Sequence, residues 1–415
     1  MRMNIPLNNT WHTLTSAPHR AMFLSGVVQG MATMIWWLLE LSGRYGWLPH
    51  SFQWSIAAVW AHAFLMIYAF LPFFMFGFLF TTYPNWMNGD KVFPRYYIPA
   101  FVLMAAGSVL FYTGLALGVE VLIIGVLLLM AGWAIALYAL LRIMIRADHP
   151  DKRHPIVTSI ALVFGWSGMA CYLLWLIDGH QWALDYARTA GIWFFLLPIF
   201  VTVSHRMVPF FSSKVLENYV VVRPYWALWL MLSCIAGHGV LQLAGADHLL
   251  WLADLPLSVT TLSLSYFWGV RRSFKVRLLA VLHVAFFWMG ISAALYALQS
   301  FVRYTSHESL YILGLAPLHA LTIGYFTSMM LGMVSRVTLG HSGQKLEADS
   351  ATWMLFWGFQ LVALLRILPE IFLALAGFSA TLFMLASLLW LASLFAWAIK
   401  YAPSYWRPRV DGKPG

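Results

Sequence analysis

The feature that most constrains this chain is a succession of apolar segments, each long enough to cross a lipid bilayer. A transmembrane helix needs about 20 consecutive apolar residues. Such segments alternate with short polar loops along the chain, and one of them is interrupted by Asp254 and Pro256. The sequence therefore predicts an all-α, polytopic membrane bundle of about twelve transmembrane helices. We expect the spans over residues 20–40, 54–82, 97–117, 120–144, 155–177, 187–211, 224–244, 250–269, 277–300, 309–335, 351–373 and 376–399.

The composition agrees with a surface that faces lipid. Hydrophobic residues make up 61% of the chain and charged residues 10%, whereas a typical soluble domain is about 25% charged. The net charge of +10 does not indicate nucleic-acid binding, because no basic run has the aromatic and polar context of such a site. We expect one membrane domain in the lipid bilayer, residues 1–415, with a polar N-terminal segment (1–19) and a polar C-terminal tail (401–415).

Basic residues are distributed unequally between the two sides of the predicted bundle. If the N-terminus is cytoplasmic, all of the 25 Lys and Arg residues lie on the inner side except Arg44, Arg188, Arg303 and Arg366. Cytoplasmic loops of membrane proteins carry such an excess of Lys and Arg. The pattern predicts an even number of spans, both termini in the cytoplasm, and an inner (cytoplasmic) membrane of bacterial type.

Histidine is the ionisable residue that recurs within the spans, and acidic residues are almost absent from span centres. An ionisable group in a bilayer is costly and marks a candidate functional site, and neutral imidazole is the commonest side-chain metal ligand. At about 1.5 Å of rise per residue, the histidines form two depth layers on separate helices. The outer layer holds His62, His238 and His319, and the inner layer holds His19, His205 and His283. Either layer could ligate haem or copper, although a lone histidine also serves as a hydrogen-bonding group between helices.

The stretch from Pro317 to Glu347 contains two further candidates. Arg336 lies at the inner end of its span, where it could anchor the helix at the membrane surface or bind a haem propionate. His341 follows between Gly340 and Gly343, so a role in a turn and a role as a ligand are both open.

The same stretch, PLHALTIGYFTSMMLGMVSRVTLGHSG, resembles the signature of the NnrS family of membrane proteins. Three other segments agree with that family in order: Pro18-His19-Arg20 with Met22-Phe23-Leu24; His62 with Gly77-Phe78-Leu79 and Pro84-Asn85-Trp86; and Leu282-His283 with Trp288. The resemblance implies a twelve-span protein that binds haem and copper and acts in nitric oxide metabolism or relief of nitrosative stress.

The resemblance also carries individual residues. The positions that match the family's motifs are His19, His62, His283, His319, Arg336 and His341, whereas His205 and His238 rest on the depth argument alone. Phe64 stands where many members have a second histidine two residues after the first. A more distant similarity links spans two and ten, with His62 and His319, to haem–copper oxidase subunit I. That oxidase's paired copper-site histidines are missing here, which argues against a binuclear centre.

These observations lead to one main hypothesis and two rivals. The main hypothesis is a membrane protein that holds haem, expected to be of b type, and copper, acts on nitric oxide or nitrosyl species, and is a candidate oxidoreductase. The rivals are a twelve-helix secondary transporter, for which Asp254-Leu255-Pro256 is the supporting feature, and a haem-dependent sensor or assembly factor. His62 and His319 are the expected axial pair, and His19, His205 and His283 are the candidates for copper or a second haem. The full candidate set is His62, His319, His283 and Arg336 for haem, and His19, His205, His238, His283 and His341 for metal.

Overall fold

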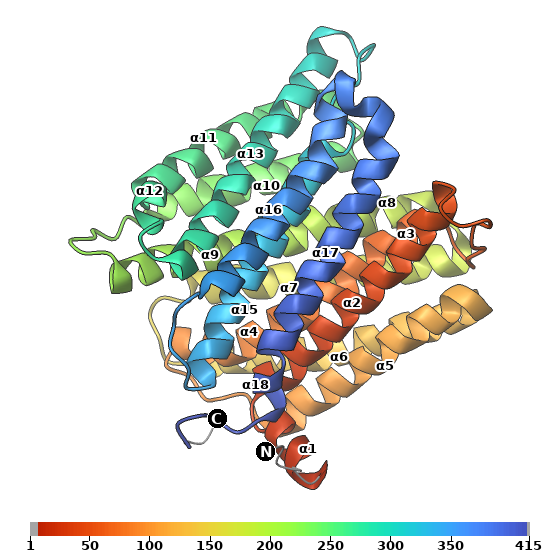
Figure 1. The fold of residues 1–415 in the computed structure, drawn as a ribbon. Helices are drawn as coiled ribbons and strands as arrows, with labels where there is room; N and C mark the ends of the chain where they lie inside the picture. Colours follow the sequence, from red (N-terminus) through yellow and green to blue (C-terminus); the bar gives the residue numbers. More distant parts are fainter. Residues whose placement is uncertain (1–6, 413–415) are drawn as a thin grey trace. The chain divides into compact units, whose positions relative to one another are not determined.

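The computed structural model describes residues 7–412, which form helices and connecting loops without a β-strand among them (Figure 1). Each predicted span corresponds to a helical segment, which confirms the all-α membrane bundle. Eleven of these segments are long and apolar enough to cross a bilayer, so the chain is a multi-pass membrane protein. The span predicted over 250–269 forms a shorter helix of 17 residues.

The segments follow one another in the predicted order: α2 (Pro18–Arg44), α3 to α4 (Ala58–Trp86), α5 (Pro94–Leu117), α6 (Val119–Arg146), α7 (Arg153–Asp178), α8 to α9 (Gln181–Val215), α10 (Tyr225–Leu243), α11 (Trp251–Phe267), α13 (Arg277–Thr305), α14 to α15 (Ala316–His341), α16 (Ser350–Ile371) and α17 (Ser379–Tyr401). Short helices lie outside this set: α1 (Leu7–Thr15), η3 (Asp247–Leu249), α12 (Val270–Ser273), η5 (Leu373–Phe378) and α18 (Pro403–Trp406).

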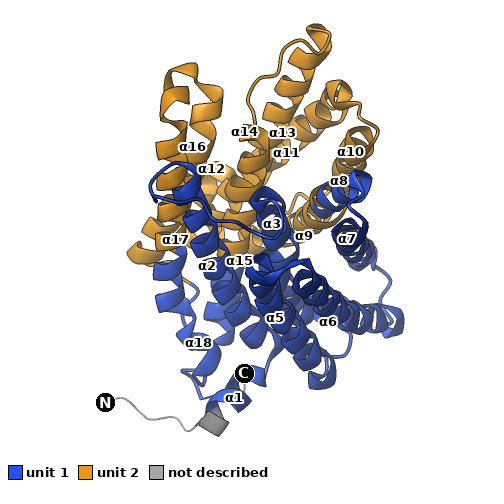
Figure 2. Ribbon diagram, turned by 90° about the vertical axis from the view of Figure 1, so that its right-hand side faces the viewer, with its two compact units in different colours: residues 1–191, 334–346, 394–415 blue, residues 192–333, 347–393 orange. Residues whose placement is uncertain are grey.

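The chain divides into two compact units, coloured separately in Figure 2. Unit 1 comprises residues 1–191, 334–346 and 394–415. Unit 2 comprises residues 192–333 and 347–393. The residues of each candidate site below belong to one unit.

Within unit 1, the helices α5 and α6 form a hairpin whose backbones are in close contact. A Cβ atom added at Gly107 would lie 2.6 Å from the carbonyl oxygen of Gly125, and one added at Gly125 would lie 2.9 Å from the carbonyl oxygen of Gly107. Small residues allow this approach in membranes, where helices associate through close packing rather than through the hydrophobic effect. The two glycines therefore set the distance between α5 and α6.

The described ends of the chain meet at one end of unit 1. Helix α1 packs against α18, and the Tyr97 hydroxyl of α5 donates a hydrogen bond to the Thr15 carbonyl oxygen at 2.6 Å. The hydroxyls of Thr338 and Tyr405 lie 2.9 Å apart, which ties α15 to α18. The first and last described helices of the chain, α1 and α18, therefore lie side by side in unit 1.

Three spans contain a widened, π-helical segment: η1 (Leu65–Phe70), η2 (Ala190–Leu196) and η4 (Ala320–Thr327). A proline follows η1 at Pro72 and η2 at Pro198, and because proline lacks an N–H group it cannot continue the regular helical ladder. After η4 there is no such proline; instead, the Thr327 hydroxyl donates to the Thr322 carbonyl oxygen at 3.0 Å, five residues back. The segments lie in the second, sixth and tenth spans, so the same irregularity recurs every fourth span.

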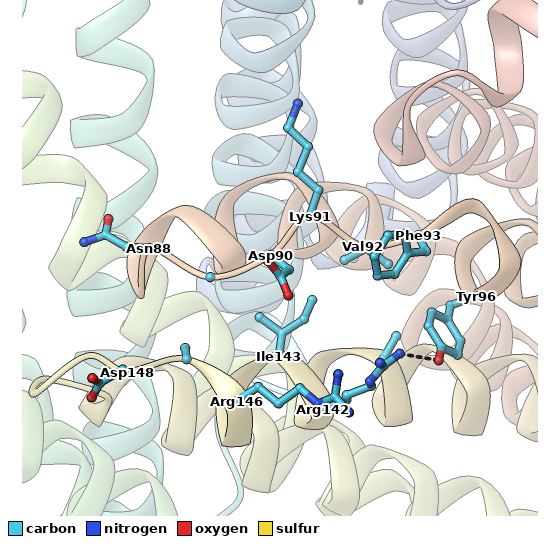
Figure 3. A pocket seen from close by; sticks show the side chains of 13 residues that line it. Asn88, Asp90, Lys91, Val92, Phe93, Tyr96, Arg142, Ile143, Arg146 and Asp148 are labelled. Carbon is cyan, nitrogen blue, oxygen red and sulfur yellow. Dashed lines mark hydrogen bonds between the residues drawn. The ribbon is translucent and has the colours of Figure 1, made fainter.

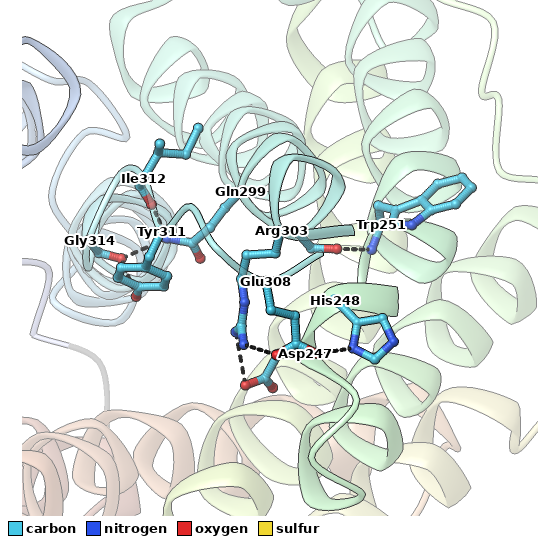
Figure 4. Close-up of polar contacts among 10 residues, drawn as sticks. Asp247, His248, Trp251, Gln299, Arg303, Glu308, Tyr311, Ile312 and Gly314 are labelled. Atoms are coloured by element: carbon cyan, nitrogen blue, oxygen red, sulfur yellow. Dashed lines mark hydrogen bonds and ion pairs between the residues drawn. The ribbon is translucent and has the colours of Figure 1, made fainter. Parts of the chain in front are cut away.

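In unit 2, polar contacts hold the loop that precedes α14 (Figure 4). The Gln299 side-chain amide donates to the carbonyl oxygens of Ile312, at 2.7 Å, and Gly314, at 2.9 Å. Arg303 forms ion pairs with Asp247, at 3.2 Å, and Glu308, at 3.1 Å. These contacts fix the start of the tenth span and therefore the position of His319.

The hairpin geometry gives a stability prediction. We expect Gly125→Ala to lower the free energy of unfolding by about 1–3 kcal/mol, the usual cost of overpacking, because its Cβ would press on backbone atoms of α5. The measurement is thermal unfolding of the detergent-purified protein. Gly377→Ala is the matched control, because a Cβ there meets nothing within 4 Å. Equal unfolding midpoints for the two variants would contradict this account.

Candidate functional site

Two candidate histidines meet within unit 1. His19 lies in the first turn of α2, and His341 is the last residue of α15. Their ring centroids are 4.5 Å apart, with an angle of 45° between the ring planes. His19 is 3% exposed, and its Nδ1 atom is buried without a hydrogen-bond partner among the described residues. An unsatisfied buried nitrogen beside a second imidazole is the arrangement that a metal ion would complete.

The surroundings of this pair, which we call the His19–His341 site, are positively charged. Arg20 is 3% exposed, and its guanidinium group donates to the carbonyl oxygen of Arg407 at 2.9 Å. Arg409 and Lys91 also interact electrostatically with His341. Positive charges repel a divalent cation more than a monovalent one. These surroundings would therefore oppose a divalent cation more strongly than a monovalent one.

The C-terminal tail adjoins the same site. The Val410 amide donates to the Ser342 carbonyl oxygen at 3.1 Å, one residue beyond His341. Arg409 is paired with Asp411 at 2.7 Å, and this pairing raises the pKa of the Arg409 guanidinium above its ordinary value. The described part of the predicted polar tail is thus packed beside the imidazole pair.

Unit 2 contains a second polar centre, formed by His238 of α10 and Asp254 of α11. His238 Nδ1 lies 2.8 Å from Asp254 Oδ1, and both side chains are fully buried. The Trp193 ring stacks on the His238 ring at a centroid distance of 3.3 Å, and the Tyr296 ring meets its edge at 5.0 Å. Together they hold the imidazole in one orientation.

Each residue of the His238–Asp254 pair has a second polar atom that forms no hydrogen bond within the described part of the chain. His238 Nε2 and Asp254 Oδ2 are buried without a hydrogen-bond partner among the described residues. A carboxylate that accepts the Nδ1–H of a histidine fixes the tautomer in which Nε2 carries the lone pair, and metal-binding histidines have this kind of support. The Asp254 carboxylate would therefore support His238 as a ligand through its Nε2 atom.

Each outer-layer histidine is associated with one of the π-helical segments. His62 lies three residues before η1, and its ring stacks on Trp37 at a centroid distance of 4.1 Å. His319 directly precedes η4, and its Nδ1 lies 3.0 Å from the Leu315 carbonyl oxygen. Trp193, which stacks on His238, lies within η2. Such segments are frequent at functional sites.

The structure brings some of the predicted candidates together and not others. His62 belongs to unit 1 and His319 to unit 2, so their role as an axial pair stays a prediction. His205 Nε2 lies 3.2 Å from the Pro224 carbonyl oxygen, whereas His283 Nε2 lies 2.9 Å from the Ser212 hydroxyl. Ser212 follows His205 by seven residues on α9, about 10 Å along the helix. His205 and His283 therefore have separate polar partners.

Two residues of the polar centre in unit 2 were not among the sequence candidates. In the sequence, Asp254 interrupts a span and is a feature of the transporter hypothesis. A carboxylate inside an apolar run also requires a buried partner, and this signal could have identified Asp254 as a candidate. Trp193 had no such signal, because aromatic residues are abundant in every span. Arg336 is partly buried in the second half of α15.

Comparisons with known proteins bear on the whole chain. The family model described as NnrS protein matches residues 13–409. That range contains the His19–His341 site, the polar centre in unit 2 and both histidines of the expected axial pair. A search of the curated proteins finds no match.

The His238–Asp254 pair gives a second stability prediction. We expect His238→Leu to lower the free energy of unfolding by about 3–5 kcal/mol, because it leaves a buried carboxyl group without its partner. Replacing both residues, in His238→Leu/Asp254→Leu, should recover most of that loss. Thermal unfolding of the single and double variants is the measurement, and additive losses would contradict the pairing.

Proposed function

The chain belongs to the NnrS family, and on that premise we propose that it holds redox metals within the membrane and acts on nitric oxide or nitrosyl species. Family membership supports a nitric-oxide-response membrane protein. The observation that carries the metal-binding part of the proposal is the meeting of His19 and His341. From the distribution of basic residues we further propose that both termini face the cytoplasm, in an inner membrane.

Copper is the metal that best fits the His19–His341 site. Imidazole nitrogens suit copper, and the positive surroundings favour the monovalent ion. Among the described residues, no group of three His, Cys, Asp or Glu side chains could hold a metal, so the two imidazoles would be its only ligands of these types.

We place haem binding at the outer-layer histidines. The Nδ1 atom of His319 contacts a backbone carbonyl oxygen. Histidines that bind a metal commonly make such a contact through their other ring nitrogen. His62 and His319 remain our proposed axial pair, and His238 with Asp254 behind it is the alternative ligand. Arg336 is the proposed partner of a propionate.

Bound haem and copper would supply the one-electron chemistry that nitric oxide, a radical, requires. The protein's own contribution is to fix the imidazoles. Stacking on Trp37 and Trp193 restrains His62 and His238, and apolar helices around the sites keep water away while admitting an apolar gas.

A proton-coupled transporter is the second candidate function. The observation that favours it is the fully buried His238–Asp254 pair next to Pro256, since carriers place protonatable pairs at interrupted helices. Proton-coupled solute uptake into vesicles by protein without bound haem or copper would support this alternative against the metal-based proposal.

The copper proposal predicts the metal content of variants. We expect the purified protein to bind about one Cu⁺ per chain, and His19→Ala and His341→Ala each to abolish that binding, because two-ligand sites do not survive the loss of one ligand. Titration against a Cu⁺-selective chelator measures the affinity. His180→Ala is the control, since His180 is exposed. Unchanged affinity in both site variants would contradict the assignment.

The haem proposal predicts an optical signature. Reduced protein with a bis-histidine haem should have a sharp α-band in its visible spectrum, and His319→Ala should remove it because the iron loses an axial nitrogen. His50→Ala, at an exposed position in the first outer loop, should leave the band unchanged. Retention of the band in the His319 variant would overturn the axial assignment.

A further inference from the structure

A small cavity lies in unit 1, and one residue of its lining, Lys91, also interacts electrostatically with His341. The loop Asn88–Val92, the start of α5 and the end of α6 enclose about 150 Å³ (Figure 3). Pockets for drug-sized ligands are typically about 300–1,000 Å³. The cavity therefore suits a small polar ligand rather than a haem.

The lining of this cavity carries charges of both signs. Arg142 and Arg146 lie one helical turn apart on α6, so their side chains share a face, and the carboxylates come from Asp90 and Asp148. Lys91 is the third basic residue of the lining, and its ammonium group points away from both arginines (Figure 3). The Arg142 guanidinium donates to the Tyr96 hydroxyl at 2.5 Å, which holds it at the cavity (Figure 3). Within residues 7–412, neither arginine forms an ion pair with either aspartate. Both pairs of charges are available to a ligand.

The position of the cavity along the helices indicates where such a ligand would come from. Helix α4 ends at Trp86, α5 begins at Pro94 and α6 ends at Arg146, so the cavity lies where three spans reach the membrane surface. Large apolar side chains beside it are exposed, namely Phe93 at 49% and Ile145 at 74%. Basic pockets between helix ends are known to bind lipid head groups.

We propose that this cavity binds a phosphoethanolamine group, a phosphate with a primary ammonium attached, as the head group of a phospholipid. The phosphate lies between Arg142 and Arg146, which bind phosphate oxygens through charge-assisted hydrogen bonds. The ammonium group donates to Asp90 and Asp148. A head group without an ammonium would leave the two carboxylates without a donor, and a quaternary choline group has no N–H to donate to them.

The test uses the full-length protein purified in detergent, with native mass spectrometry to follow bound lipid. We expect phosphatidylethanolamine to be retained over phosphatidylglycerol and phosphatidylcholine. Arg142→Gln/Arg146→Gln should weaken its binding about tenfold or more through loss of two charge-assisted contacts. Asp90→Asn/Asp148→Asn should shift the preference towards phosphatidylglycerol. Arg271→Gln, which changes a basic residue on the short helix α12 of unit 2, should change neither.

Two further measurements show whether the ligand is a lipid or a free compound, and whether the variants are folded. If soluble phosphoethanolamine binds the parent protein as tightly as the lipid does, and the arginine variant no longer binds it, the ligand need not be a lipid. That result would overturn the assignment to a phospholipid head group. Equal binding of the three lipids, or an arginine variant that binds lipid normally, would overturn the proposal. Each variant should keep the unfolding midpoint and Cu⁺ content of the parent protein, so failure here is distinguishable from failure of the metal-binding function.

Discussion

The structure depends on the cost of leaving a polar group without a partner in hydrocarbon. That cost forces the backbone into helices and requires each buried polar side chain to find a partner or to serve a ligand. Arg20 donates to a backbone carbonyl group, and Asp254 pairs with His238. Several buried nitrogens lack a hydrogen-bond partner among the described residues, and His19 Nδ1 and His238 Nε2 are the two that also adjoin another candidate ligand or a supporting carboxylate. They are therefore the positions at which we expect ligands to bind.

Much of the fold could be predicted because it follows from this constraint alone. The lengths of the apolar segments gave the order of the spans, and the short helix over Trp251–Phe267 corresponds to the segment that Asp254 and Pro256 interrupt. The π-helical segments could not be predicted, because they depend on where Pro72 and Pro198 meet the helical ladder and on local side-chain contacts. Their recurrence every fourth span is visible only in the structure.

The contacts of the candidate histidines could not be derived from the sequence. Depth along the helices grouped His19 with His205 and His283, a grouping that stays a prediction, and gave no indication that His19 contacts His341. Depth is a single coordinate, and the pairing also depends on how each helix is rotated and on where the chain turns after α15. For the same reason, Asp254 could be recognised as costly from sequence, while its partner could not be named.

The central claim is that the imidazoles of His19 and His341 hold one copper ion. X-ray absorption spectroscopy at the copper edge of the purified, Cu⁺-loaded protein tests it most directly. The account predicts a Cu⁺ edge and multiple scattering from two imidazole rings, without a sulfur shell. Scattering dominated by sulfur, or with no imidazole contribution, would contradict it.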